Sequence, residues 1–156
     1  MVDSSRTIAV IGIGHEARGD DAVGRMVAKR IRERVQSNVV VIELDGNPTQ
    51  LLDIWKNVKC AIVVDAVRAR GTPGTIYRVD LITGKLPPDV HPTSSHGFGV
   101  SSVVELGRTL DQLPQRLILI GIAGEQFDAG ASASPSVVAA IPEVCAMIES
   151  EINAAL

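Results

Sequence analysis

Acidic side chains follow the apolar segments of this sequence, and one histidine lies in a glycine-flanked loop between two such segments. Two carboxylates and an imidazole form a donor set that suits a divalent metal ion with open coordination positions. Carboxylates can also act as general bases toward water. In chain order, the candidates are Asp20 and Asp21 after the first apolar run, Asp45 after the second, Asp65 within the third, His96 in the loop, and Glu125 after the last run.

Each of these residues also has an ordinary structural interpretation. Asp20 or Asp21 can cap the helix expected to follow, and Asp45 before a glycine can start a turn. Asp65 is different, because it lies inside an apolar strand where an unpartnered carboxylate is costly to bury. The other histidine, His91, lies in a proline-rich stretch and is expected to be a solvated loop residue.

The elements that position these residues follow from the apolar pattern. Apolar runs at 8–13, 39–44 and 61–67 alternate with helical spacing over about 23–35 and a short helix that ends at Trp55. Runs that are apolar on both faces and alternate with helices predict a parallel sheet covered on both sides. Because ligands bind beyond the carboxyl ends of such strands, the candidate acids are expected to share one edge.

One strand in the second half of the chain is expected to run opposite to the others. Only seven residues, 68–74, separate the third run from a fourth at 75–79, whereas a parallel crossover needs a dozen or more. The fourth strand is therefore predicted to be antiparallel. The remaining expected elements are a helix over 100–110, a strand over 117–122, and a last helix that starts at Pro135 with Ser134 as its cap; Asn47 or Thr49 is the expected cap of the short helix.

The composition suits one domain over residues 1–156, of which 46% are hydrophobic and 21% charged. The predicted fold class is α/β: a doubly wound, mostly parallel five-stranded sheet with one antiparallel strand and helices on both faces. Cys60 and Cys145 lie in apolar patterns without C-x-x-C spacing and are expected to be core residues.

Charge and apolar run length argue against several partners. The chain has 15 Lys+Arg against 18 Asp+Glu and only 3% aromatic residues, so it lacks the basic, stacking surface that nucleic acids need. No apolar run approaches the ~20 residues that span a bilayer. We therefore expect a cytoplasmic protein without a nucleic-acid or membrane partner.

Two other functions match part of the pattern. The segment 12–17 reads G-x-G-x-x-A after a strand, and Glu43 could be the ribose-binding acid of a dinucleotide-binding oxidoreductase domain. Asp20 and Asp21 would oppose the pyrophosphate at the following helix. A receiver-like phospho-acceptor signalling domain would also use an acid pair and Asp65, but here the pair follows the first strand late and the fifth strand ends without a lysine.

Taken in order, the motifs resemble the hydrogenase maturation endopeptidases over nearly the whole chain. They are Gly12-Ile13-Gly14 with the acid pair and Gly24, then Asp45-Gly46, Val64-Asp65-Ala66, Ser95-His96-Gly97 and Leu119-Ile120-Gly121-Ile122. The resemblance implies a small doubly wound domain that removes a C-terminal extension from the large-subunit precursor of a nickel-iron hydrogenase after nickel insertion, with nickel as part of what is recognised.

By motif position, the resemblance also implies that Asp21, Asp65 and His96 contact the metal and carry the catalysis. The nickel is then delivered by the substrate, no organic cofactor is expected, and the protein is expected to be a monomer. The family commonly has Asn where this chain has His15. We expect this imidazole to support the loop, although an added metal ligand or a subfamily with another substrate are the alternatives.

The sequence favours attack by water over covalent catalysis. It has no G-x-S-x-G nucleophile elbow, and neither cysteine lies near the glycine-rich loops. A metal can polarise the scissile carbonyl while Asp21 or Asp65 acts as general base, and whether the metal is catalytic or only recognised is left open. We also expect Arg18, Arg68 and Arg70 to lie beside the acids and to hold the precursor electrostatically.

Overall fold

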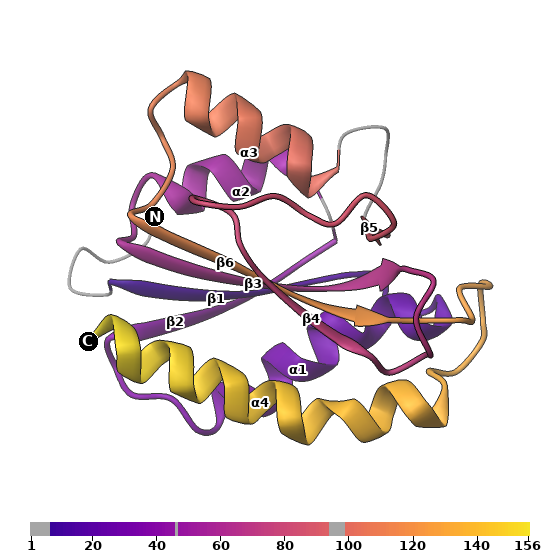
Figure 1. Cartoon of the computed structure of the whole chain (residues 1–156). Helices are drawn as coiled ribbons and strands as arrows, with labels where there is room; N and C mark the ends of the chain where they lie inside the picture. The colour runs from indigo at the N-terminus through magenta and orange to yellow at the C-terminus, as the bar shows by residue number, and fades with distance from the viewer. Residues whose placement is uncertain (1–6, 46, 94–98) are drawn as a thin grey trace.

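The computed structural model describes residues 7–45, 47–93 and 99–156, which form one sheet with helices on both faces (Figure 1). The strand order is β2-β1-β3-β6-β4, and a short strand, β5, pairs with β3 outside this order. The strands are β1 (Ile8–Ile13), β2 (Val39–Leu44), β3 (Cys60–Arg68), β4 (Ile76–Asp80), β5 (His91–Pro92) and β6 (Arg116–Ala123). The helices are α1 (Val23–Arg32), α2 (Pro48–Trp55), α3 (Val100–Thr109) and α4 (Pro135–Ala155), and a 3-10 turn, η1 (Gly19–Ala22), precedes α1.

The pairing confirms the doubly wound, mostly parallel sheet. Strand β1 is parallel to β2 and β3, β3 is parallel to β6, and β4 is antiparallel to β6 as the short connection predicts. Strand β5 is an addition to the five predicted strands and pairs antiparallel with the end of β3. His91 is exposed, as expected, but it lies in this strand and not in a loop. A strand of two residues is too short to show a periodic pattern in the sequence. Pro92 also has no backbone N–H to donate, and for this reason proline is confined to edge strands.

Helices α1 and α4 cover one face of the sheet, and α2 and α3 cover the other (Figure 1). Successive residues of β3 alternate between these two cores: Ile62 and Val64 pack in the first, Ala61 and Val63 in the second. This two-sided burial explains the continuous apolar runs. By the same alternation, Asp65 lies on the α2 and α3 face. Within the described ranges, no helix is long and apolar enough to cross a membrane.

Two glycines bring the backbones of β1, η1 and α1 into close contact. A Cβ at Gly24 would lie 2.4 Å from the carbonyl oxygens of Ile13 and Val64, so α1 packs directly on the ends of β1 and β3. Gly14 has φ of +154°, and a Cβ there would lie 1.8 Å from the carbonyl oxygen of Asp21. The glycine pattern thus folds η1 back over the end of β1 and fixes the position of Asp21.

The helix caps differ in part from the predictions. Asn47 caps α2 by accepting a hydrogen bond from Thr49 N, and Pro135 occupies the first turn of α4, both as expected. The predicted capping by Asp20 or Asp21 is wrong, because α1 begins after Ala22 without a side-chain cap. Ser134 occupies the cap position of α4, but its side chain makes no capping hydrogen bond there.

Candidate active site

Asp21 lies in η1, just beyond the end of β1, and only 5% of its surface is exposed. Its Oδ2 accepts a hydrogen bond from His15 N (3.0 Å), and its Oδ1 lies 2.6 Å from Thr93 Oγ1, which can donate to it. Thr93 N in turn donates to Ala66 O at 3.0 Å. Asp21 therefore connects the loop after β1 to the last residues of β3.

Asp65 lies near the end of β3 and is fully buried. It follows Val64, which pairs with Gly12 of β1, and it pairs with Gly121 of β6. Strands β1 and β3 are the point where the strand order reverses, and α/β sheets bind ligands in the crevice beyond such a point. The prediction that Asp21 and Asp65 share this edge is confirmed.

His96, the third predicted ligand, lies outside the described residues. In the described parts of the chain, no group of three His, Cys, Asp or Glu side chains is arranged to hold a metal ion. The metal-binding triad therefore stays a prediction. The side chain of His15 is partly buried, and its backbone N–H supports Asp21.

Asp20 has a different task from its neighbour, although both acids follow the same glycine-rich loop. It is completely buried, and its carboxylate accepts four hydrogen bonds: from Glu125 N (2.8 Å), Gln126 N (3.0 Å), Ser134 N (2.6 Å) and Ser134 Oγ (2.8 Å). Burial raises the pKa of Asp20, but these hydrogen bonds together outweigh it and hold the pKa below its usual value. Asp20 thus joins η1 to the loop after β6 and to the start of α4.

Two other candidate acids have local roles. Asp45 is exposed, and its Oδ1 accepts a hydrogen bond from Asn47 N at 3.2 Å, which confirms the predicted turn. Glu125 has an exposed side chain and contributes its backbone N–H to Asp20. Neither side chain helps to hold Asp21 or Asp65 among the described contacts.

Glu43, the acid considered for ribose binding, is held by basic residues of α1. Its oxygens lie 3.3 Å from Arg25 Nε and 3.0 Å from Arg32 Nη1, and Lys29 Nζ is 3.7 Å away. Lys29 also pairs with Glu16 of the loop after β1. Glu43 therefore serves to hold α1 against the end of β2.

The two cysteines are buried free thiols, as predicted. Burial raises the pKa of the Cys60 thiol to about 11, and burial also raises the pKa of Cys145. Neither thiol is ionised at neutral pH, so neither can supply a thiolate nucleophile. This agrees with the preference for attack by water.

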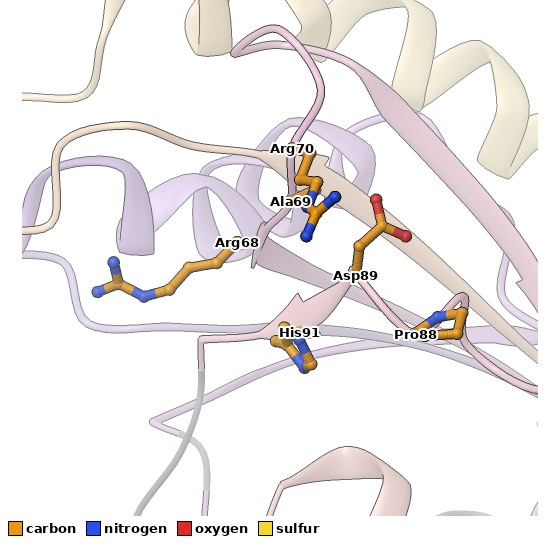
Figure 2. A pocket seen from close by; sticks show the side chains of 6 residues that line it. All are labelled: Arg68, Ala69, Arg70, Pro88, Asp89 and His91. Carbon is orange, nitrogen blue, oxygen red and sulfur yellow. The ribbon is translucent and has the colours of Figure 1, made fainter.

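Two arginines lie at this edge of the sheet, because Arg68 is the last residue of β3 and Arg70 follows it. Arg68 is exposed, and its guanidinium lies 4.2 Å from the centre of the Phe127 ring. Arg68 and Arg70 line a pocket of about 660 Å³ together with residues of the segment that leads into β5 (Figure 2). Arg18 lies in the loop after β1 and is also exposed.

The fold and site define a small doubly wound α/β domain with two buried carboxylates at its topological switch point. The model of the hydrogenase maturation protease family matches residues 23–151. The chain therefore belongs to the hydrogenase maturation protease family and is an endopeptidase of that class. This membership replaces the oxidoreductase and receiver interpretations.

Curated relatives agree with the family. The chain is 29% identical over 143 residues to the hydrogenase 2 maturation protease of Escherichia coli K12. The match covers 86% of this chain and 83% of that protein. It is 27% identical over 129 residues to the hydrogenase expression/formation protein HupD of Thiocapsa roseopersicina, covering 80% of this chain and 58% of that protein.

Solved structures show the same fold. The hydrogenase maturating endopeptidase HybD of E. coli superposes with a TM-score of 0.76 at 23% identity, covering 96% of this chain and 93% of that one. The hydrogenase 2 maturation peptidase of a Thaumarchaeota archaeon gives a TM-score of 0.71 at 17% identity, covering 95% and 99%. The arrangement of the sheet and its edge is thus shared across distant relatives.

Proposed function

We propose that this protein removes the C-terminal extension of a nickel-iron hydrogenase large-subunit precursor after nickel insertion, and that it recognises the nickel carried by that substrate. The observation that supports this most directly is the pair of buried carboxylates, Asp21 and Asp65, at the ends of β1 and β3. Oxygen donors on different segments leave coordination positions open for a metal that arrives with its own ligands.

The charge of Asp21 supports its assignment to this role. Its two described partners, the His15 N–H and the Thr93 hydroxyl, are neutral donors. Over the described ranges, no Lys, Arg or His side chain forms an ion pair with Asp21. Its negative charge is therefore left for a metal ion or for a proton taken from water.

The covalent chain supports His96 as the third donor. Thr93 contacts Asp21 directly, and three residues span at most about 11 Å even when fully extended. The length of chain after Thr93 therefore allows residue 96 to reach this edge of the sheet. We propose Asp21, Asp65 and His96 as the protein's ligands to the nickel of the substrate, with no organic cofactor.

We assign the general base to Asp21, because 5% of its surface is exposed whereas Asp65 is fully buried. In the proposed reaction, water attacks the scissile carbonyl carbon while Asp21 takes the proton from the water. The carbon–nitrogen bond then breaks, and the same proton passes to the departing amine. The first products are the carboxylic acid terminus of the mature subunit and the amine of the extension, and the acid then gives its proton to the amine, which leaves a carboxylate and an ammonium group. Nickel held beside this bond would polarise the carbonyl as a Lewis acid.

Nickel-dependent processing is the direct test of this function. We expect the pure protein to shorten a nickel-loaded large-subunit precursor at its C-terminus and to leave the nickel-free precursor intact. Intact-protein mass spectrometry measures the loss. Equal cleavage of the two precursors would overturn nickel recognition, and cleavage of neither would overturn the assigned substrate.

The isolated protein should bind free nickel or zinc only weakly, because three donors, two of them carboxylates, leave the coordination incomplete. Calorimetric titration of the wild type and a His96→Ala variant measures this affinity. We expect weak binding that His96→Ala weakens further. A tight stoichiometric site that survives the substitution would show that the proposed ligand set is wrong.

A further inference from the structure

The pocket beside the two arginines lies between the end of β3 and the segment that leads into β5. Its lining residues are Arg68, Ala69, Arg70, Pro88, Asp89 and His91. The two walls are held together because Arg68 pairs with His91 in the short antiparallel ladder. In Figure 2, the side chains of Arg70 and Asp89 extend into the same space, and the Arg68 side chain extends to the other side of β3.

The cations of this pocket differ from most other cations of the protein in having no direct counter-charge. Arg25 and Arg32 pair with Glu43, and Arg78 and Arg116 pair with Glu151. Neither Arg68 nor Arg70 forms an ion pair within the described residues, and Asp89 forms none either.

Formal charges then indicate what the pocket can take. Two arginines and one aspartate give the pocket a formal charge of +1 with His91 neutral. A charge of +1 matches a single carboxylate better than a doubly charged phosphate.

Arg68 is held in position before any ligand arrives. Its guanidinium lies over the Phe127 ring, and the loop that precedes Phe127 is fixed by the hydrogen bonds from Glu125 N and Gln126 N to Asp20. This stacking fixes the guanidinium on the side of β3 away from Arg70 and Asp89 (Figure 2). The positive charge of Arg68 is therefore fixed beside the space that Arg70 and Asp89 share.

The pocket also lies close to the proposed catalytic centre. His91 precedes Thr93 by two residues, and Thr93 contacts Asp21. At the strand rise of ~3.3 Å per residue, His91 and Thr93 are about 7 Å apart along the chain, which is the length of two residues of an extended peptide. A peptide bound at Asp21 can thus place a nearby group in the pocket.

We propose that this pocket is a substrate subsite that binds one carboxylate of the precursor's C-terminal segment through Arg70, with Arg68 on the other side of β3 adding positive charge at its margin (Figure 2). The carboxylate is either an acidic side chain near the scissile bond or the terminal carboxylate of the extension. This inference rests on the proposed peptidase function and adds the charge of the segment that the enzyme selects.

The test uses four decapeptides of glycine, alanine and serine that carry a central Glu or Gln and a free or amidated C-terminus. Binding to the full-length protein is followed by NMR shifts of the arginine Nε–H signals, without nickel and without cleavage. The reference is the peptide with a central Gln and an amidated C-terminus, which has no carboxylate. Tighter binding of the amidated Glu peptide would identify an acidic side chain as the ligand. Tighter binding of the Gln peptide with a free C-terminus would identify the terminal carboxylate.

Variants separate the pocket from general electrostatics. The double variant Arg68→Gln/Arg70→Gln should bind the preferred peptide about tenfold more weakly. The control Arg30→Gln removes an equally exposed arginine of α1, which lies outside the pocket, and should bind as the wild type does. An Arg70→Glu variant should instead prefer a peptide with a central Lys.

Two outcomes would overturn the subsite: equal affinity for all four peptides, or an equal loss of affinity in the Arg30→Gln control. These results leave nickel-dependent processing unaffected, so they are distinguishable from a failure of the proposed function. Conversely, carboxylate selection that persists in a protein unable to process any precursor would overturn the function and retain the pocket.

Discussion

An Asp21→Asn variant should fold as the wild type does and process the precursor about 10²- to 10⁴-fold more slowly, which is the range that a general base contributes. The asparagine can keep both contacts, because its Oδ1 can accept from His15 N and its amide can donate to Thr93 Oγ1. What the substitution removes is the negative charge. The expected loss therefore reports the missing charge, which serves both the base and the nickel ligand, and not a rearranged site.

Initial rates of mass loss from a nickel-loaded precursor measure this effect, with thermal melts run beside them. The matched control is Asp53→Asn, an exposed acid of α2 whose described contact is an ion pair with Lys56. The control should keep the wild-type rate. Full activity in Asp21→Asn would remove Asp21 from the catalytic residues.

An Asp20→Ala variant should lower the free energy of unfolding by about 3–5 kcal/mol. The change leaves the N–H and hydroxyl of buried Ser134 without their acceptor and frees two further N–H groups, and each unsatisfied buried donor costs roughly 1–3 kcal/mol. Exposed positions at Glu125 and Gln126 let water compensate part of this loss. Urea denaturation at neutral pH measures the difference.

The pH dependence of the same variant provides an independent check. The pKa of Asp20 is lower in the folded protein than its ordinary value of 3.8, so the ionised carboxylate stabilises the fold above that value. This stabilisation is lost as the pH falls through the folded pKa. Stability should therefore fall less steeply in acid for Asp20→Ala than for the wild type. A Ser134→Ala control, which removes one of four donors, should cost only about 1 kcal/mol.

Much of the fold could be predicted from local pattern. The bounds of β1 and β2 follow from uninterrupted apolar runs, and the antiparallel direction of β4 follows from a connection too short for a crossover. Strand β5 could not be predicted, because two residues that include a proline show no alternation. Pairing with β3 forms it, and that pairing is a tertiary contact.

The site shows the same division between local and distant causes. The placement of Asp21 and Asp65 at the same edge of the sheet follows from the rule for strand ends in α/β sheets. The separate task of Asp20 does not, because its partners lie 105 to 114 residues further along the chain. Likewise, the placement of Arg68 at the carboxyl end of β3 was predictable to within one residue, whereas its contact with Phe127 depends on how the loop after β6 folds.

The long separation between Asp20 and Ser134 also sets an order of events during synthesis. The carboxylate of Asp20 can accept hydrogen bonds from Ser134 only after that residue, which directly precedes α4, has left the ribosome. Contacts between such distant residues form late, because a long loop must close before they are made. The contacts that hold Asp20, the neighbour of Asp21 in η1, are therefore complete only when most of the chain has been made.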